Sequence, residues 1–309
     1  MKGLRLSELF FEQSVCPAFA EELPHQEFQR LAFGLVGPGS ECYGFDDELS
    51  RDHDWGPRVI VWVPSTTSKD AIARYQAIYD GLDPYCFGYG HSQKVDSSII
   101  RQGVHPIDGF FSSVLGYDHP PATELEWMVV KEEALSLATN GKVFSDGPGL
   151  VTAFRTTLME YYPTDVWLKK ISSRCALIAQ YGQSNLLRSY ARKDDLGVCY
   201  ELAMVAREAA MLVYLLKEQY RPYYKWLFLG LEGLGDLGCS VREQLEELFA
   251  VRSMRERVEI IEVLVVCLQN AIATVLDLTP STSCMLSLAE QIQKRIKSDF
   301  LQGYPGLLE

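Results

Sequence analysis

The sequence has little positive charge. Its 309 residues include 29 lysines and arginines against 41 aspartates and glutamates, which gives a formal net charge of −12 at pH 7. Without a basic excess, the chain lacks the attraction that nucleic-acid-binding proteins use on the phosphate backbone. We therefore do not expect nucleic acid as a partner, whereas a local basic pocket for one nucleotide stays compatible with this charge.

Long apolar runs and closely paired cysteines are also missing. The longest apolar runs, 209–216 and 263–268, are much shorter than the roughly 20 residues of a membrane span, and residues 1–19 contain no uninterrupted apolar core. Among the eight cysteines the closest two, Cys267 and Cys284, stand 17 residues apart, which is too far for a zinc-binding pair. We expect free thiols, a cytoplasmic location and no membrane contact.

Familiar catalytic patterns are absent as well. The sequence has no Walker lysine motif, no Rossmann glycine pattern and no recognisable Ser-His-Asp or thiol-His arrangement. The composition, 47% hydrophobic and 23% charged, is nevertheless that of a globular protein rather than a disordered one. Any chemistry must therefore come from a different pattern.

The pattern of apolar residues predicts two domains. In the first half, β-prone segments at 31–37, 59–63 and 97–104 alternate with a helical segment at 68–82 and an amphipathic helix that ends near Pro17. From about Thr152 onward helical periodicity dominates, and asparagine, glycine and proline cluster at 140–150. We predict an α+β fold: a mixed sheet with flanking helices in residues 1–148, and an all-α helical bundle in residues 149–309.

Several helices of the second half can be placed. An apolar stripe with steps of three and four residues predicts a helix that ends before Pro222, and Ser240 with Glu243 forms a capping-box pattern that predicts a helix start. Two further long helices are expected at 254–276 and 284–300. The stripe consists of Leu202, Val205, Ala209, Leu212 and Leu216.

One segment, residues 35–63, suggests chemistry. Gly39 and Ser40 follow an expected strand, and Asp52 and Asp54 stand before the next strand, with Asp52 twelve residues after Ser40. Alternate residues of a strand project from one face about 6.5–7 Å apart, so two such carboxylates can bridge a pair of Mg²⁺ ions. A glycine-serine turn at a helix start adds backbone and hydroxyl donors for a phosphate group.

This spacing resembles the active-site motif of the nucleotidyltransferase superfamily with the polymerase-beta-like fold. The wider string GFDDELSRDHDWG is similar to an uncharacterised bacterial family of nucleotidyltransferase-like proteins with a helical C-terminal domain, broadly like that of the kanamycin nucleotidyltransferases. The resemblance implies that Asp52 and Asp54 bind Mg²⁺ and that Gly39 and Ser40 hold the phosphates of a nucleoside triphosphate. A solvated acidic loop is the alternative interpretation of the same residues.

The resemblance also requires a third carboxylate on a neighbouring strand, and here the sequence departs from the pattern. His105 occupies the expected position, and histidine is a poor ligand for magnesium, which prefers oxygen. Asp96 or Asp108 must supply the missing oxygen, and we name Asp108 as the candidate catalytic residue. If neither does so, the site holds metal weakly, or the protein binds nucleotides without turning them over.

Two functions follow from this pattern. The first is an enzyme that transfers a nucleoside monophosphate from a triphosphate to a hydroxyl of a small molecule or protein, with two metal ions that align the phosphate for in-line attack. The second is a catalytically weakened module that binds nucleotides for regulation or interaction. The helical domain is expected to supply the acceptor pocket.

Other candidates have equally ordinary explanations. In YRPYYKW, Lys225 and Tyr224 could contact the triphosphate and the base, or the segment could be a packing cluster. Acidic residues at 41, 46, 47 and 48 could line a pocket for a cationic acceptor, or only solubilise a loop. Arg188, Arg192 and Lys193 could form a basic patch or a solvated helix end. Glu124 and Glu126 could include a general base, or they could be charges near a helix cap.

Overall fold

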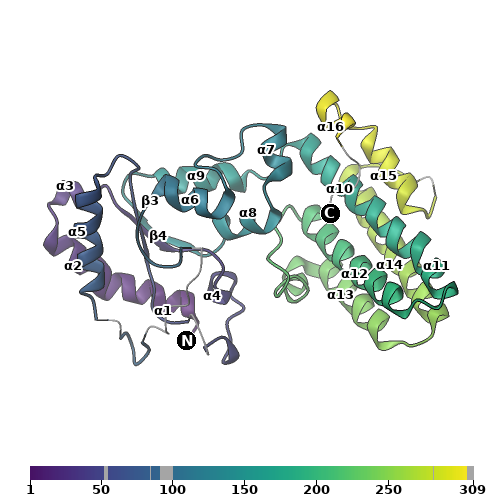
Figure 1. Cartoon of the computed structure of the whole chain (residues 1–309), viewed down its shortest axis with the longest axis horizontal. Helices are drawn as coiled ribbons and strands as arrows, with labels where there is room; N and C mark the ends of the chain where they lie inside the picture. Colours follow the sequence, from purple (N-terminus) through teal and green to yellow (C-terminus); the bar gives the residue numbers. More distant parts are fainter. Residues whose placement is uncertain (52–54, 84, 91–99, 281, 305–309) are drawn as a thin grey trace. The chain divides into compact units, whose positions relative to one another are not determined.

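A computed structural model of the protein describes residues 1–51, 55–83, 85–90, 100–280 and 282–304. The chain forms two compact units, Met1–Tyr161 and Tyr162–Glu309 (Figure 1). The first contains a mixed sheet with helices and the second is helical in its described residues, which confirms the predicted α+β class with a helical C-terminal region.

The first unit begins with a long helical segment made of α1 (Gly3–Phe10), the π-helix η1 (Phe11–Val15) and α2 (Cys16–Glu22). Pro17 therefore lies inside the segment and does not end it, contrary to the prediction. Proline lacks a backbone N–H and crowds the preceding turn, and the wider π turn just before it accommodates both effects.

The rest of the first unit alternates short strands with helices. The strands are β1 (Ala32–Leu35), β2 (Ile60–Val63), β3 (Gly103–Pro106) and β4 (Lys142–Asp146). The helical elements are α3 (His25–Phe28), α4 (Ser40–Tyr43), η2 (Leu49–Arg51), α5 (Lys69–Asp80), α6 (Ile107–Leu115), α7 (Glu124–Val129), α8 (Glu132–Thr139) and α9 (Leu150–Met159). The strands predicted at 31–37 and 59–63 and the helix at 68–82 are confirmed, and the third strand lies slightly later than predicted.

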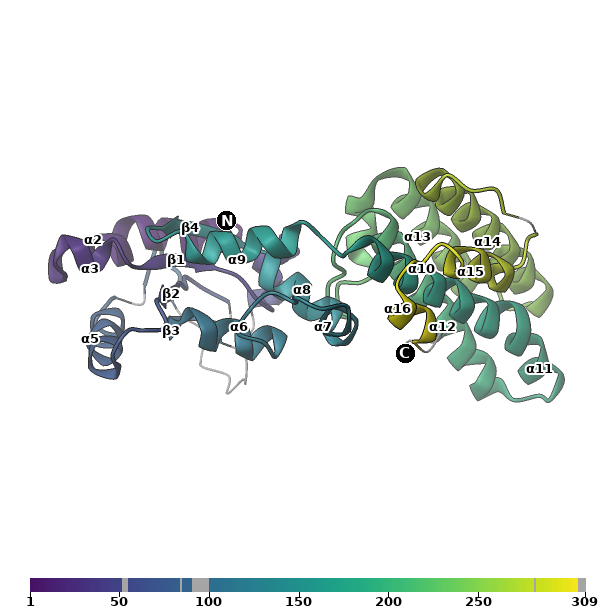
Figure 2. The same cartoon turned by 90° about the horizontal axis from the view of Figure 1, so that it is seen from above.

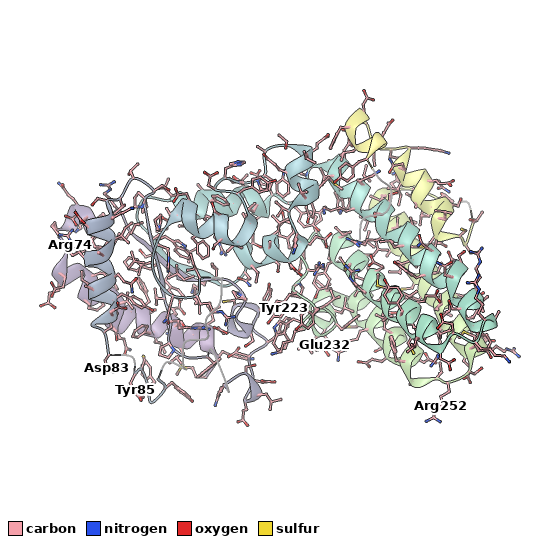
Figure 3. The ribbon with its side chains drawn as sticks, viewed as in Figure 1. Arg74, Asp83, Tyr85, Tyr223, Glu232 and Arg252 are labelled. Atoms are coloured by element: carbon pink, nitrogen blue, oxygen red, sulfur yellow. The ribbon has the colours of Figure 1, made fainter. Side chains whose placement is uncertain are left out.

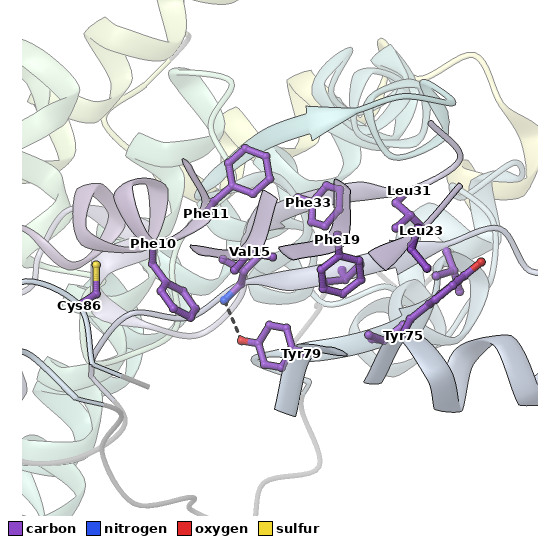
Figure 4. Packing of buried hydrophobic residues seen from close by; sticks show 14 of the residues in the cluster. Phe10, Phe11, Val15, Phe19, Leu23, Leu31, Phe33, Tyr75, Tyr79 and Cys86 are labelled. Carbon is purple, nitrogen blue, oxygen red and sulfur yellow. Dashed lines mark hydrogen bonds between the residues drawn. The ribbon is translucent and has the colours of Figure 1, made fainter. Parts of the chain in front are cut away.

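The four strands form one sheet in the order β3-β2-β1-β4. β1 runs antiparallel to β2 and β4, whereas β2 and β3 are parallel. On one face Phe33 and Val61 join a core with residues of the N-terminal helices and α5, such as Phe10 and Phe19 (Figure 4). On the other face Trp62 packs edge-on against Phe110 of α6. Alternate residues of β2 thus face two helical layers.

The second unit is built from α10 (Thr164–Ile178), η3 (Ala179–Asn185), α11 (Leu186–Ala191), α12 (Asp195–Leu216), η4 (Leu229–Leu234), α13 (Gly235–Ala250), α14 (Met254–Leu276), α15 (Met285–Gln293) and α16 (Asp299–Gly303) (Figure 2). α10 packs on both α12 and α15, and α12 also contacts α13 and α14. The predicted stripe lies on α12, where all five residues are buried.

Three predictions for the second half are wrong. The boundary lies after Tyr161 rather than after residue 148, because α9 packs on α8 and β4 of the first unit. α13 begins at Gly235 and runs through Ser240, whose hydroxyl accepts a bond from Gln244 instead of capping a helix. The helix predicted at 284–300 is broken between α15 and α16.

α14 has the predicted bounds. Among the described residues it is the one helix long and apolar enough to cross a membrane, judged by length and composition alone. Its most apolar window has a mean hydropathy of 1.9. Its buried face includes Ile261, Leu264 and Leu268, which pack within the helical unit. Val263, Val266 and Val275 of the same helix are exposed, so packing in the bundle accounts for only part of this composition.

Candidate functional site

The candidate site is one edge of the sheet. In the antiparallel pair of β1 and β2, Gly34 lies opposite Ile60, so the carboxyl end of β1 and the amino end of β2 meet at the same edge. The parallel pair of β2 and β3 brings Gly103, at the amino end of β3, to this edge as well. Asp52 and Asp54 themselves lie outside the described residues.

The turn between β1 and α4 is held from a distant part of the chain. Asn140 accepts a hydrogen bond from the backbone N–H of Gly37 (2.8 Å) and donates one to its carbonyl (2.7 Å). Gly37 has φ +117°, a conformation that side chains other than glycine rarely adopt. The segment from Gly37 to Ser40 is therefore a fixed turn, with Gly39 at the N-cap of α4 and Ser40 as its first residue.

Gly39 is required here for space. A Cβ atom at this position would lie 2.4 Å from Oε2 of Glu41, because the Glu41 carboxylate folds back beneath the turn. Glu41 is 2% exposed and forms a buried ion pair with Arg58, which stands just before β2. This ion pair ties the start of α4 to the amino end of β2.

The residues around Asp46 are bound to the N-terminal helix. The buried Asp46 carboxylate accepts hydrogen bonds from the backbone N–H of Gly3 (2.7 Å) and from Nε1 of Trp55 (3.2 Å), and Lys2 forms an ion pair with it. Asp47 accepts bonds from Ser50 at the loop surface. The carboxylates at 41, 46 and 47 thus have structural partners, and they do not form an open acidic pocket for a cationic acceptor.

Residues that precede and follow Asp52 and Asp54 in the sequence pack together. The guanidinium of Arg51 stacks over the Trp55 ring at 5.0 Å and over the Tyr89 ring at 5.7 Å. Trp55 and Tyr89 also meet edge to face, with ring centroids 5.2 Å apart. Arg51 and Trp55, which flank residues 52–54 in the sequence, therefore belong to one aromatic cluster with Tyr89.

The structure does not bring Asp108 to this edge. Asp108 lies in the first turn of α6, beyond the carboxyl end of β3, where its carboxylate accepts a bond from the backbone N–H of Gly109 (2.8 Å). Because β3 is parallel to β2, this is the opposite edge from Ser40, and the strand between them spans about 13 Å. Asp96, the other candidate, lies outside the described residues.

His105 stands beside Trp62 on β3. Its Nε2 lies 2.8 Å from the carbonyl oxygen of Gln102, and burial lowers the pKa of the imidazole. A half-buried neutral ring bonded to the backbone is a structural residue. In the ranges that the structure covers, no group of three histidine, cysteine, aspartate or glutamate side chains is arranged to hold a metal ion.

Lys225 and Tyr224 lie in the second unit, in the segment before η4. Both are exposed, Tyr224 by 83%, and Nζ of Lys225 sits 4.9 Å from the centre of the Trp226 ring. The neighbouring Tyr223, labelled in Figure 3, accepts a hydrogen bond from Nε1 of Trp226. The segment therefore packs within itself through Trp226, as one of the two interpretations expected, while the two candidate side chains point outward.

Glu126 belongs to a capping box. Its carboxylate accepts bonds from the backbone N–H groups of Ala122 (2.6 Å) and Thr123 (3.1 Å), and Thr123 caps the helix in return. These bonds lower the pKa of Glu126, which favours the charged cap over a general base.

The sequence analysis did not predict three residues that hold the site region: Asn140, Arg58 and Arg155. Arg155 of α9 is buried and donates to the carbonyl oxygens of Ala138, Thr139 and Asn140, so it holds the end of α8 and the backbone of Asn140. Burial lowers its pKa to about 10. The only signal in the sequence is the Asn140-Gly141 pair, which predicts a turn but not its partner.

Known proteins resemble the chain only in part. Residues 127–227 match a protein family described as "Domain of unknown function (DUF4037)", a match that leaves out the turn at 37–40. No curated protein matches the sequence. A crystal structure of a nucleotidyltransferase-like protein from Exiguobacterium sibiricum 255-15 is similar with a TM-score of 0.39 and 13% identity, over 86% of this chain and 78% of that one. So distant a likeness does not by itself indicate a function.

Proposed function

We propose that the first unit binds a nucleoside triphosphate and transfers its nucleoside monophosphate to a hydroxyl of a small molecule or protein. The observation that supports this most is the fixed turn Gly37–Ser40 at the sheet edge from which β2 starts. A phosphate group needs donors at close range, and Ser40, the first residue of α4, carries a backbone N–H and a hydroxyl.

In this proposal Asp52 and Asp54 hold Mg²⁺, whose preference for oxygen ligands fits two carboxylates. The metal would neutralise the triphosphate and polarise its α-phosphorus. The residues of the chain do the positioning: Ser40 and the backbone of α4 hold the phosphates, while the Glu41–Arg58 ion pair keeps α4 against the start of β2.

A second candidate is supported by a specific observation. His105 stands where a third carboxylate is expected, and Asp108 lies at the far edge of the sheet. With two carboxylates only, the site would bind a nucleotide and turn it over slowly or not at all. The protein would then act as a nucleotide-binding regulatory or interaction module. In both cases we expect the protein to act in the cytoplasm, away from membranes and without nucleic acid.

The experiment that separates these functions measures pyrophosphate release. The purified chain is incubated with Mg²⁺ and each of the four ribonucleoside triphosphates, together with a pool of hydroxyl-bearing acceptors. We expect release that is lost in Asp52→Asn/Asp54→Asn and kept in Asp108→Asn. Asp70→Asn, an exposed aspartate on α5, is the matched control.

A thermal-shift measurement completes the test. A rise in melting temperature with Mg²⁺ and triphosphate, in the absence of pyrophosphate release, would favour the regulatory module. If neither the melting temperature nor the pyrophosphate signal responds in the wild-type chain, both functions are wrong. Release that persists in Asp52→Asn/Asp54→Asn would assign the activity to other residues.

A further inference from the structure

The second unit contains a large cavity of its own. Its volume is about 1020 Å³, and it lies between α10 with η3 on one side and α15 with α16 on the other. All lining residues belong to the helical unit, so the cavity does not depend on the sheet edge described above. Sites for small molecules in proteins have volumes of about 300–1,000 Å³. This cavity is large enough for a small ligand.

One wall of the cavity is a π-helix. Gln180 and Ser184 of η3 line the cavity, and Gln183 borders it with its amide bonded to the backbone of Ser283 and Met285. Gly182 lies on the side that faces α12, where a Cβ atom would be 3.0 Å from a methyl group of Val205. Gly182 thus permits close packing at the back of the turn, while amide and hydroxyl groups line its front. π turns within helices occur frequently at functional sites.

Lys169 of α10 lines the cavity and is its most unusual residue. It is 1% exposed, and its ammonium donates to Oε1 of Gln293 (3.2 Å) and to the backbone carbonyl of Tyr304 (2.8 Å). In the described part of the chain, no carboxylate forms an ion pair with it. Burial lowers the pKa of this lysine. A buried ammonium held only by neutral oxygens is costly, and a negatively charged ligand would offset that cost.

Positive side chains outnumber negative ones in the lining of the cavity. Arg188 and Lys294 line the cavity as exposed residues, and one carboxylate, Glu290, stands among them. Together with Lys169 this makes three positive groups against one negative group, in a chain whose net charge is −12. Such a local reversal of sign attracts anions toward the cavity.

Small and apolar residues make up much of the remaining lining. Ala176, Ala179 and Ala289 line the cavity, and the Ser172 hydroxyl is already used in a bond to the Ala289 carbonyl (2.8 Å). Leu286 and the exposed Cys284 also border it. This combination of cations, amides and small apolar residues suits a molecule with an anionic head group and a less polar body.

We propose that this cavity is a binding site for a small organic anion, whose phosphate or carboxylate group is bound by Lys169 and attracted by Arg188 and Lys294. The site is independent of the proposed nucleotide site, and Asp52→Asn/Asp54→Asn leaves it unchanged.

Cys284 provides a direct test in the full-length chain. Iodoacetate and iodoacetamide alkylate thiols in the same way, but only iodoacetate is an anion. We measure both rates by peptide mass spectrometry at Cys284 and at two exposed cysteines outside the cavity, Cys199 and Cys239. The ratio of the iodoacetate rate to the iodoacetamide rate is expected to be about threefold or more higher at Cys284.

Competition and variants then identify the residues. Inorganic phosphate or acetate, compared with chloride at constant ionic strength, should lower the ratio at Cys284 with saturation, and the stronger competitor identifies the head group. Arg188→Gln/Lys294→Gln, which changes only exposed side chains, should remove the preference. Lys297→Gln, an exposed lysine outside the cavity, should leave it unchanged.

Lys169→Met tests the buried end. Phosphate or acetate should compete at least about threefold more weakly in this variant than in the wild-type chain. If Lys169→Met does not fold, the exposed double variant still decides the question. Equal rate ratios at the three cysteines, no competition by either anion beyond that of chloride, or an equal effect of Lys297→Gln would each overturn the proposal.

Discussion

At the scale of single residues, two buried charges determine how the candidate site is held. Glu41 and Arg58 are both nearly inaccessible, with side chains 2% and 7% exposed, and they connect α4 to the start of β2. Two such charges stabilise a fold only as a pair, because a single one left behind is buried without compensation. From the sequence, Glu41 was one of several acids in a loop, and nothing indicated its partner.

We predict that Arg58→Met lowers the free energy of unfolding by about 3–5 kcal/mol, because Glu41 then remains buried alone. The control is Arg74→Met on α5, at the residue labelled in Figure 3. It breaks a pair with Glu27, in which the two side chains are 52% and 35% exposed. There we expect a loss below about 1 kcal/mol. Urea denaturation followed by circular dichroism measures both, and similar losses in the two variants would contradict the role of burial.

At the scale of elements, the link between α8 and β4 fixes the turn after β1. Asn140 bonds to Gly37, and the backbone N–H of the next residue, Gly141, donates to the carbonyl of Cys42 (3.0 Å). Gly141 has φ +60°, and a Cβ atom there would lie 2.0 Å from the Leu35 carbonyl oxygen. This link can approach β1 only because it carries no side chain at that point.

Gly141→Ala is therefore expected to destabilise the first unit by about 2–4 kcal/mol, the sum of an unfavourable φ and a backbone clash. It should also speed hydrogen exchange of the Gly37 amide. In α6, by contrast, a Cβ atom at Gly109 would meet only Pro106, at 3.9 Å. Gly109→Ala should stabilise by about 0.5–1 kcal/mol, because alanine is the better helix former. Thermal unfolding with exchange mass spectrometry decides whether the two variants change stability in opposite directions.

At the scale of the whole molecule, the division into two units depends on α9. Val151 and Leu158 of this helix are fully buried, and its Phe154 ring stacks on Phe111 of α6 at 3.6 Å. Arg155 binds the last carbonyls of α8. The cluster of glycine and proline at 140–150 marks turns around β4 inside the first unit and not the boundary between the units.

Two fragments test this boundary. We predict that residues 1–161 unfold in one cooperative transition, whereas residues 1–148, which contain β1 to β4 but lack α9, melt at a lower temperature or without cooperativity. Residues 162–309 should give a helical spectrum on their own, because that unit has its own core. Equal melting curves for residues 1–148 and 1–161 would contradict this boundary and support the one predicted from the sequence, after residue 148.

Periodic and local features were the ones that the sequence predicted well. The strand at 59–63, the helix at 68–82, the stripe from Leu202 to Leu216 and the helix at 254–276 depend on the pattern of apolar residues along the chain, which the structure preserves. The failures at Pro17 and Ser240 are helix ends, where a π turn or a preceding helical turn outweighs the local signal. At the break in 284–300, the Asp165 carboxylate accepts hydrogen bonds from the backbone N–H groups of Lys297 and Ser298, and Ser298 caps α16.

The sequence by itself determined the fold class, the helical second half, and the order of a glycine-serine turn and two aspartates along the chain. Only the tertiary structure decided that Asn140 and Arg58 hold that turn, that Asp108 lies at the other edge of the sheet, and that Lys169 is buried beside a cavity. The physical reason is range: hydrophobic periodicity is a property of neighbouring residues, whereas hydrogen bonds, ion pairs and cavities join residues far apart in the chain. Asn140 and Gly37 are 103 positions apart, and no local pattern relates them.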